Sequence, residues 1–176
     1  MLSNSATFKI RLATPADVPE IFSLIQALAE YEKLAHQVTG SPKELALHLF
    51  GDSSELDQSS RRYIEAIVAQ ASDQLVGFAL FFHNYSTFLT APGLYLEDLF
   101  VLPDYRGIGI GKALITKVAE LAVERNCGRV EWSVLDWNDS AIAFYQHLGA
   151  TLLPDWRTCR VTGEALVHMA TLQSNV

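Results

Sequence analysis

Short runs of alternating or continuous apolar residues predict the strands of this chain. These runs lie at residues 7–12, 63–69, 75–82, 94–101, 130–134 and 156–161. Apolar residues three and four positions apart predict helices over residues 14–31, 42–50, 109–125 and 138–148, with a short helical tail from Thr162. Paired strands come first and then alternate with helices. This order predicts an α/β fold of the mixed α+β kind, with helices on both faces of a mixed sheet.

Turn and cap residues set the limits of these elements. Thr14 can cap the first helix, and Pro15 suits its first turn. Gly149 ends the helix at 138–148, as a residue in the left-handed conformation would. The stretch 51–60 is polar and rich in Ser and Asp, which predicts a loop.

Composition places the chain among globular proteins. Hydrophobic residues make up 49% of the 176 residues and charged residues 19%. The length fits one domain, which we expect over residues 7–172 after a disordered N-terminus at 1–6. The net charge of −7 argues against nucleic-acid binding and favours a small cationic partner.

Several other classes of site and location are not supported by the residues. The two cysteines, Cys127 and Cys159, have no CxxC or metal-type spacing, and the histidines show no HxxxH or HExxH pattern, so we expect no metal. The N-terminus lacks the features of a signal peptide, and no apolar run approaches the ~18 residues that span a bilayer. We therefore expect a cytoplasmic protein with no membrane partner.

The segment RGIGIGK at 106–112 lies between a predicted strand and a predicted helix. Glycines let the backbone approach a ligand closely, and the first N–H groups of a helix form an anion site. The Walker pattern GxxxxGK[ST] is absent, and neither frame gives the GxGxxG of a dinucleotide site. The segment therefore predicts a loop that binds the phosphates of some other ligand.

A second candidate feature is the pair Glu97 and Asp98 in the centre of the apolar strand LYLEDLFV. Unpaired charge inside a core costs several kcal/mol or shifts a pKa. On a regular strand the two side chains face opposite sides, and a bulge re-aims either of them. The alternative to a functional role is a structural one, in which both acids pair with Arg side chains or backbone donors.

The spacing Arg106-x-x-Gly109-x-Gly111 after a strand resembles the acetyl-CoA diphosphate loop of the GNAT superfamily of N-acetyltransferases. LYLEDLFVLPDYRGIGIGKALI, VLDWNDSAIAFYQHLGA and LAEYEK together resemble its spermidine/spermine (diamine) and thialysine acetyltransferase branch. The resemblance spans most of residues 8–170. It implies a single domain whose mixed sheet of six to seven strands splays apart between strands four and five, and a homodimer.

The resemblance also implies site residues, with acetyl-CoA as co-substrate. The expected cofactor-binding residues are Leu99, Phe100, Val101, Arg106, Gly107, Ile108, Gly109, Ile110, Gly111, Lys112, Asn138 and Ser140. The expected catalytic residues are Tyr145, Glu97 and Asp98, and the expected substrate-binding residues are Tyr31, Glu32, Glu97 and Asp155.

These residues suit the chemistry of amine acetylation. An alkylamine has a pKa near that of Lys, ~10.4, so the site must bind a cation and then remove its proton. A carboxylate in a partly buried cleft can bind the cation and accept its proton, directly or through water. The sequence does not decide whether Glu97, Asp98 or a water chain is the base. The Tyr145 phenol would protonate the departing thiolate. A backbone N–H, such as that of Leu99, would stabilise the carbonyl oxygen.

The sequence departs from the diamine branch at Ser86 and Phe88, where an acid and a Trp are expected. The missing acid weakens the case for spermidine or spermine and favours a shorter diamine or a lysine-like amino acid such as thialysine. We expect direct transfer to a small amine in a ternary complex. The alternatives are a non-catalytic CoA-sensing module and an acetyltransferase for a protein N-terminus or lysine.

Overall fold

The structure is a computed structural model that describes residues 7–51 and 62–172. The predictions for residues 1–6 and for nearly all of the loop at 51–60 lie outside the described residues. The chain forms two compact units, Met1–Ser133 and Val134–Val176. The predicted fold class is confirmed.

The first unit holds the sheet and most of the helices. Its elements in chain order are β1 (Phe8–Leu12), the 3-10 turn η1 (Pro15–Asp17), α1 (Val18–Tyr31), η2 (Ala35–Gln37), α2 (Pro42–Phe50), β2 (Glu65–Ala71), β3 (Gln74–Ser86), β4 (Ala91–Val101), η3 (Pro103–Tyr105), α3 (Ile110–Glu124) and β5 (Val130–Trp132). The second unit holds α4 (Asp139–His147) and α5 (Gly163–Thr171).

The five strands form one sheet in the order β1-β2-β3-β4-β5. The first four are antiparallel to one another, and β5 runs parallel to β4. The β4–β5 pairing covers only Leu94–Leu96 against Val130–Trp132, whereas β4 continues to Val101 beside β3. The pairing of strands four and five therefore ends in the middle of β4, as the expected splay requires.

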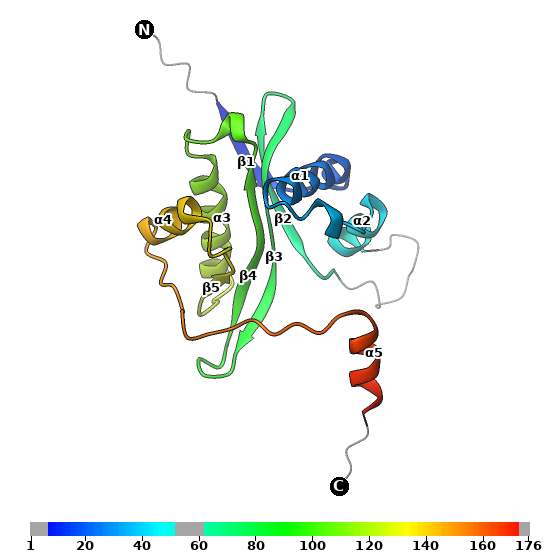
Figure 1. Cartoon of the computed structure of the whole chain (residues 1–176). Helices are drawn as coiled ribbons and strands as arrows, with labels where there is room; N and C mark the ends of the chain where they lie inside the picture. The colour runs from blue at the N-terminus through cyan, green and yellow to red at the C-terminus, as the bar shows by residue number, and fades with distance from the viewer. Residues whose placement is uncertain (1–6, 52–61, 173–176) are drawn as a thin grey trace. The chain divides into compact units, whose positions relative to one another are not determined.

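Helices cover both faces of the sheet: α1 and α2 lie on one face and α3 on the other (Figure 1). Alternation along β2 shows the two faces, because Ala66 and Val68 join the core under α1 while Ile67 and Ala69 point to the opposite side. The core under α1 and α2 is built from Val18, Ile21, Leu24, Leu49, Ala66, Val68, Leu75, Phe78, Leu80 and Phe100.

One predicted strand is absent. Residues 156–161 have no strand structure, and the described residues contain five strands where six to seven were expected. Alternation favours a strand, but a strand also needs a neighbouring strand to pair with its N–H and C=O groups. The prediction from alternation alone was wrong there. The helical tail predicted from Thr162 is present as α5.

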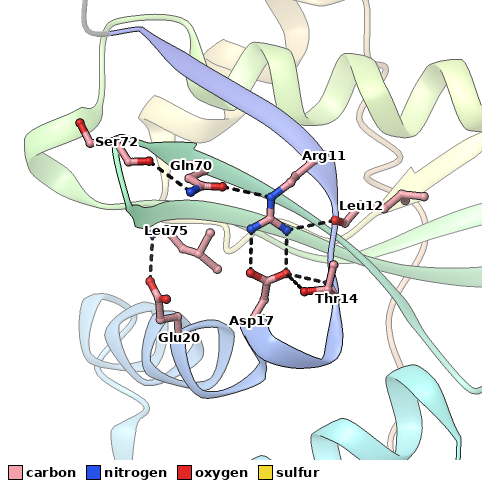
Figure 2. A network of polar contacts seen from close by, with 8 residues as sticks. All are labelled: Arg11, Leu12, Thr14, Asp17, Glu20, Gln70, Ser72 and Leu75. Atoms are coloured by element: carbon pink, nitrogen blue, oxygen red, sulfur yellow. Dashed lines mark hydrogen bonds and ion pairs between the residues drawn. The ribbon is translucent and has the colours of Figure 1, made fainter.

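A polar network fixes the start of α1 against the sheet (Figure 2). Two Arg11 nitrogens donate to the two Asp17 carboxylate oxygens at 2.7 Å, and Arg11 Nε donates to Gln70 on β2. The Thr14 N–H and hydroxyl both donate to Asp17 Oδ2. On the next turn the Leu75 N–H of β3 donates to Glu20. Since Asp17 is only 6% exposed, its charge depends on these donors.

We predict that Asp17→Asn destabilises the fold. The Arg11 hydrogen bond holds the pKa of Asp17 at about 2, below its ordinary 3.8. The ionised carboxylate therefore stabilises the fold above pH ~4, and this contribution is lost as pH falls toward 2. Urea denaturation at pH 7 should show a loss of roughly 2 to 4 kcal/mol, and the difference from the wild type should shrink below pH 4.

The matched control is Asp73→Asn, which makes the same change on the exposed β2–β3 turn. It should alter the free energy of unfolding by less than about 0.5 kcal/mol. Equal stability of Asp17→Asn and wild type at pH 7 would contradict the role given to this network.

Candidate active site

A β-bulge interrupts β4 at the Glu97-Asp98 pair. Leu96 lies opposite Phe81 of β3 and Asp98 lies opposite Leu80, so Glu97 has no residue opposite it. Two residues of β4 therefore span one interval of β3, which defines a bulge. The bulge falls directly after Leu96, where the pairing of β4 with β5 ends.

The extra residue reverses the side-chain alternation of β4. Leu96 shares a face with Phe81, on the side of α3, whereas Asp98 shares a face with Leu80, on the side of α1. Phe100 follows Asp98 onto the α1 side and joins the core there. Without the bulge, Leu96 and Asp98 would point to the same face. The bulge thus gives the two acids different environments: the Asp98 side chain is half-buried beside α1, and the Glu97 side chain is exposed.

Asp98 lies in a field that opposes its ionisation. Burial, together with the charges of Glu97 and Glu32, raises the pKa of Asp98 to about 7. Glu32 caps the C-terminal end of α1, and burial raises its pKa as well. None of the ion pairs among the described residues includes Glu32, Glu97 or Asp98. These three acids therefore form a site that a bound cation would stabilise.

The residue at the end of α1, Tyr31, contacts the loop that follows β4. The carbon at the centre of the Arg106 guanidinium lies 4.5 Å from the centroid of the Tyr31 ring and 5.6 Å from that of Phe100. Arg106 Nε also donates to the Val101 carbonyl at 2.9 Å. The Arg106 side chain is therefore engaged on the α1 side of the sheet, which the glycine motif alone did not indicate.

The glycine loop has the geometry of an anion site. Gly107 and Gly109 have φ angles of +79° and +95°, which side chains rarely adopt. A Cβ added at either glycine would meet nothing within 4 Å. Gly109 caps α3, whose first backbone bond runs from Ala113 N–H to Gly109 O. The N–H groups of residues 110–112 precede that bond and are available to a diphosphate.

The other residues of this segment have distinct environments. Lys112 is exposed in the first turn of α3, and Ile108 is exposed in the loop. The side chains of Phe100, Val101 and Ile110 are buried in the core, and the Val101 carbonyl already accepts from Arg106 Nε. Leu99 is half-buried. The structure thus brings the predicted loop residues together at one end of α3.

The remaining predicted site residues belong to the second unit. The Asn138 side chain caps α4 by accepting from the Ala141 N–H at 3.2 Å, and Ser140 donates to the same oxygen at 3.1 Å. Asn138 and Ser140 therefore lie together at the start of α4. Tyr145 lies on the last turns of α4, with its ring tilted against Phe144, and Asp155 is exposed in the segment that follows.

Ser86, which replaces the acid expected in the diamine branch, has a structural role. It is 4% exposed, and its hydroxyl accepts from the Leu89 N–H at 3.2 Å in the β3–β4 turn. Its hydroxyl therefore supports the hairpin.

Two structural findings bear on metals and membranes. The described residues contain no group of three or more His, Cys, Asp or Glu side chains placed to hold a metal ion. Within residues 7–51 and 62–172, no helix is both long enough and apolar enough to cross a membrane.

Comparison with known proteins bears on this site. Residues 25–150 match the model of the acetyltransferase (GNAT) family. A thialysine N-epsilon-acetyltransferase of Mus musculus is 39% identical over 94% of this chain and 98% of its own length. An L-ornithine N5-acetyltransferase, NATA1, of Arabidopsis thaliana is 37% identical over 90% of this chain and 86% of its own length. The solved structure of an integron cassette protein of V. cholerae has a TM-score of 0.74 and 25% identity, covering 94% of this chain and 98% of that one.

We predict that Asp98→Asn stabilises the protein at neutral pH. The folded pKa of about 7 exceeds the ordinary 3.8, so the fold favours the protonated carboxyl. The stability of the wild type is full below pH ~4 and falls as pH rises through 7, because ionisation is costly in the fold. The amide carries no such cost. Thermal unfolding should show the variant about equal at pH 4 and more stable by roughly 2 to 4 kcal/mol at pH 8.

The comparison variant is Asp104→Asn, at an exposed position of η3. It should follow the wild-type pH dependence throughout. If Asp98→Asn proves less stable than wild type at pH 8, Asp98 has a structural partner and the account of its charge fails.

Proposed function

Because the chain belongs to the acetyltransferase (GNAT) family of acyltransferases, we propose that it transfers an acetyl group from acetyl-CoA to a primary amine of a small cationic substrate. The transfer is direct, within a ternary complex. The observation that carries this proposal is Asp98, a half-buried carboxylate with a raised pKa beside Glu97 and Glu32, none of which forms an ion pair among the described residues. It lies on the strand that leads into the glycine loop.

The acid cluster supports a cationic amine as acceptor. An alkylammonium near Glu32, Glu97 and Asp98 would relieve their mutual repulsion, which is the reason that the site selects a cation. Once bound, the ammonium must lose a proton before its nitrogen is nucleophilic. Asp98, with a pKa near neutrality, is suited to accept it, and exposed Glu97 is suited to hold the substrate charge.

The co-substrate fits the residues of the loop. Acetyl-CoA supplies an activated thioester, and its diphosphate suits the N–H groups at the start of α3 and the Lys112 ammonium. From Leu99 to Val101, the edge of β4 that faces away from β3 would be open to the co-substrate, since β5 no longer pairs with it, except at the Val101 carbonyl, which accepts from Arg106. The Leu99 N–H would stabilise the carbonyl oxygen as charge develops on it.

Roles in the second unit rest on the family resemblance and on local geometry. Asn138 and Ser140 would contact the pantetheine chain, with the Asn138 amide nitrogen left for this purpose because its oxygen caps α4. The Tyr145 phenol would donate a proton to the leaving thiolate. Asp155, which is exposed, would contact the distal end of the substrate.

The substrate that we favour is a short diamine or a lysine-like amino acid such as thialysine or ornithine. Two relatives are named for thialysine and L-ornithine. The structural role of Ser86 supports the same preference, because a long polyamine would need a further counter-charge at that position. A homodimer and a cytoplasmic location stay predictions.

We predict that the purified protein releases free thiol from acetyl-CoA in the presence of a suitable amine. The panel should contain thialysine, ornithine, lysine, putrescine, spermidine and an aminoglycoside, followed with a thiol reagent. The short amines should give kcat/KM values at least about tenfold above that of spermidine, because each unmatched charge costs on the order of 1 kcal/mol or more. An absence of turnover with every amine would contradict the proposed function.

We predict that Asp98 sets the acidic limb of the pH profile of kcat/KM. This parameter reports the free enzyme, so it should rise with pH and bend near the Asp98 pKa of about 7. Asp98→Asn should lose this bend and at least about 100-fold in kcat/KM. Glu97→Gln should keep the bend but shift it to lower pH, because the Glu97 charge helps to raise the pKa of Asp98. A bend lost in Glu97→Gln and kept in Asp98→Asn would assign the base to Glu97 instead.

A further inference from the structure

The Arg106 side chain connects two elements that come from distant parts of the sequence. Its backbone follows η3 and begins the glycine loop, and its Nε donates to the carbonyl of Val101, the last residue of β4. Its guanidinium lies over the ring of Tyr31, the last residue of α1, and near the ring of Phe100. One side chain therefore bridges the end of β4 and the end of α1.

The end of α1 needs such support. Lys33, two residues after Tyr31, has a φ angle of +62°, a conformation that costs energy for a residue with a side chain. The last turn of α1 contains no basic residue, although a cation near a helix C-terminus is favourable. Arg106 brings a cation from another element to the Tyr31 ring in this turn. Glu32, which raises the pKa of Asp98, lies between Tyr31 and Lys33.

We propose that Arg106 is a positioning residue for the amine: it braces the end of α1 against β4, so that Tyr31 and Glu32 stay beside Asp98. This inference rests on the proposed amine site. The backbone of the loop, rather than the Arg106 guanidinium, then carries the anion-binding role of the motif. Arginine suits the brace because its planar group stacks on a ring while Nε donates a hydrogen bond.

The test uses three variants of the full chain. Arg106→Met keeps most of the stem and removes the charge and the donor, Arg106→Lys keeps the charge alone, and Tyr31→Leu removes the ring from the other side of the contact. Each is assayed for amine KM and kcat, and its affinity for CoA is measured by calorimetry. Lys112→Met is the contrasting variant, whose expected defect is in CoA affinity.

We predict that Arg106→Met and Tyr31→Leu each raise the amine KM about tenfold with little change in kcat, the pattern of lost substrate positioning. The double variant should be no worse than either single variant, because both remove one contact. Arg106→Lys should resemble Arg106→Met, since a lysine lacks the planar group and Nε donor. Fully additive effects, or an unchanged amine KM in Arg106→Met, would overturn the proposal.

Amide hydrogen exchange gives a readout that needs no turnover. Arg106→Met should speed exchange at the last turn of α1 and at residues 32–34, and leave the middle of α3 unchanged. Unchanged exchange at the end of α1 would refute the brace even in an active enzyme. Faster exchange there in a protein that acetylates no amine would retain the brace and reject the proposed function, so the two failures can be told apart.

Discussion

A single extra residue in β4 determines to which face of the sheet Asp98 points. Because Glu97 has no partner on β3, the strand changes face between Leu96 and Asp98. The two leucines at positions 94 and 96 can therefore pack on the α3 side, while Asp98 and Phe100 point to the α1 side. A regular strand would point Asp98 to the α3 side of the sheet, away from Glu32 at the end of α1. Pairing with β5 stops at the same point, so beyond the bulge β4 has a strand partner on one side only.

The charges of Glu97 and Glu32 beside Asp98 disfavour folding, and favourable interactions elsewhere in the first unit offset this cost. Asp17 and Asp98 show the contrast, because both are carboxylates on the same side of the sheet. Asp17 receives hydrogen bonds from Arg11 and Thr14, which lower its pKa to about 2. Asp98 has acids as its charged neighbours, and its pKa rises to about 7. A carboxylate that accepts hydrogen bonds from protein donors stabilises the fold, whereas one without such donors can bind a cationic ligand instead.

The sequence predicted the elements well where local chemistry decides them. The α3 boundaries and the positive φ of Gly149 both follow from residue types at short range. The strand predicted at residues 156–161 is absent, because alternation favours an extended backbone but does not supply a neighbouring strand to pair with. The sequence could not choose between Glu97 and Asp98 either. LYLEDLFV fits a regular strand and a bulged one equally well, and only the register against β3 distinguishes them.

The Arg106 contact shows a further limit of reading a motif. The spacing from Arg106 to Gly111 constrains the backbone, since Gly107 and Gly109 need positive φ and an open approach. It carries no information on the Arg106 side chain, whose direction depends on Tyr31, 75 positions earlier in the chain. Backbone N–H groups can hold a diphosphate whatever the side chains do. The side chain is then available to support α1, and one short loop can serve both the proposed anion site at α3 and the proposed amine site beside Asp98.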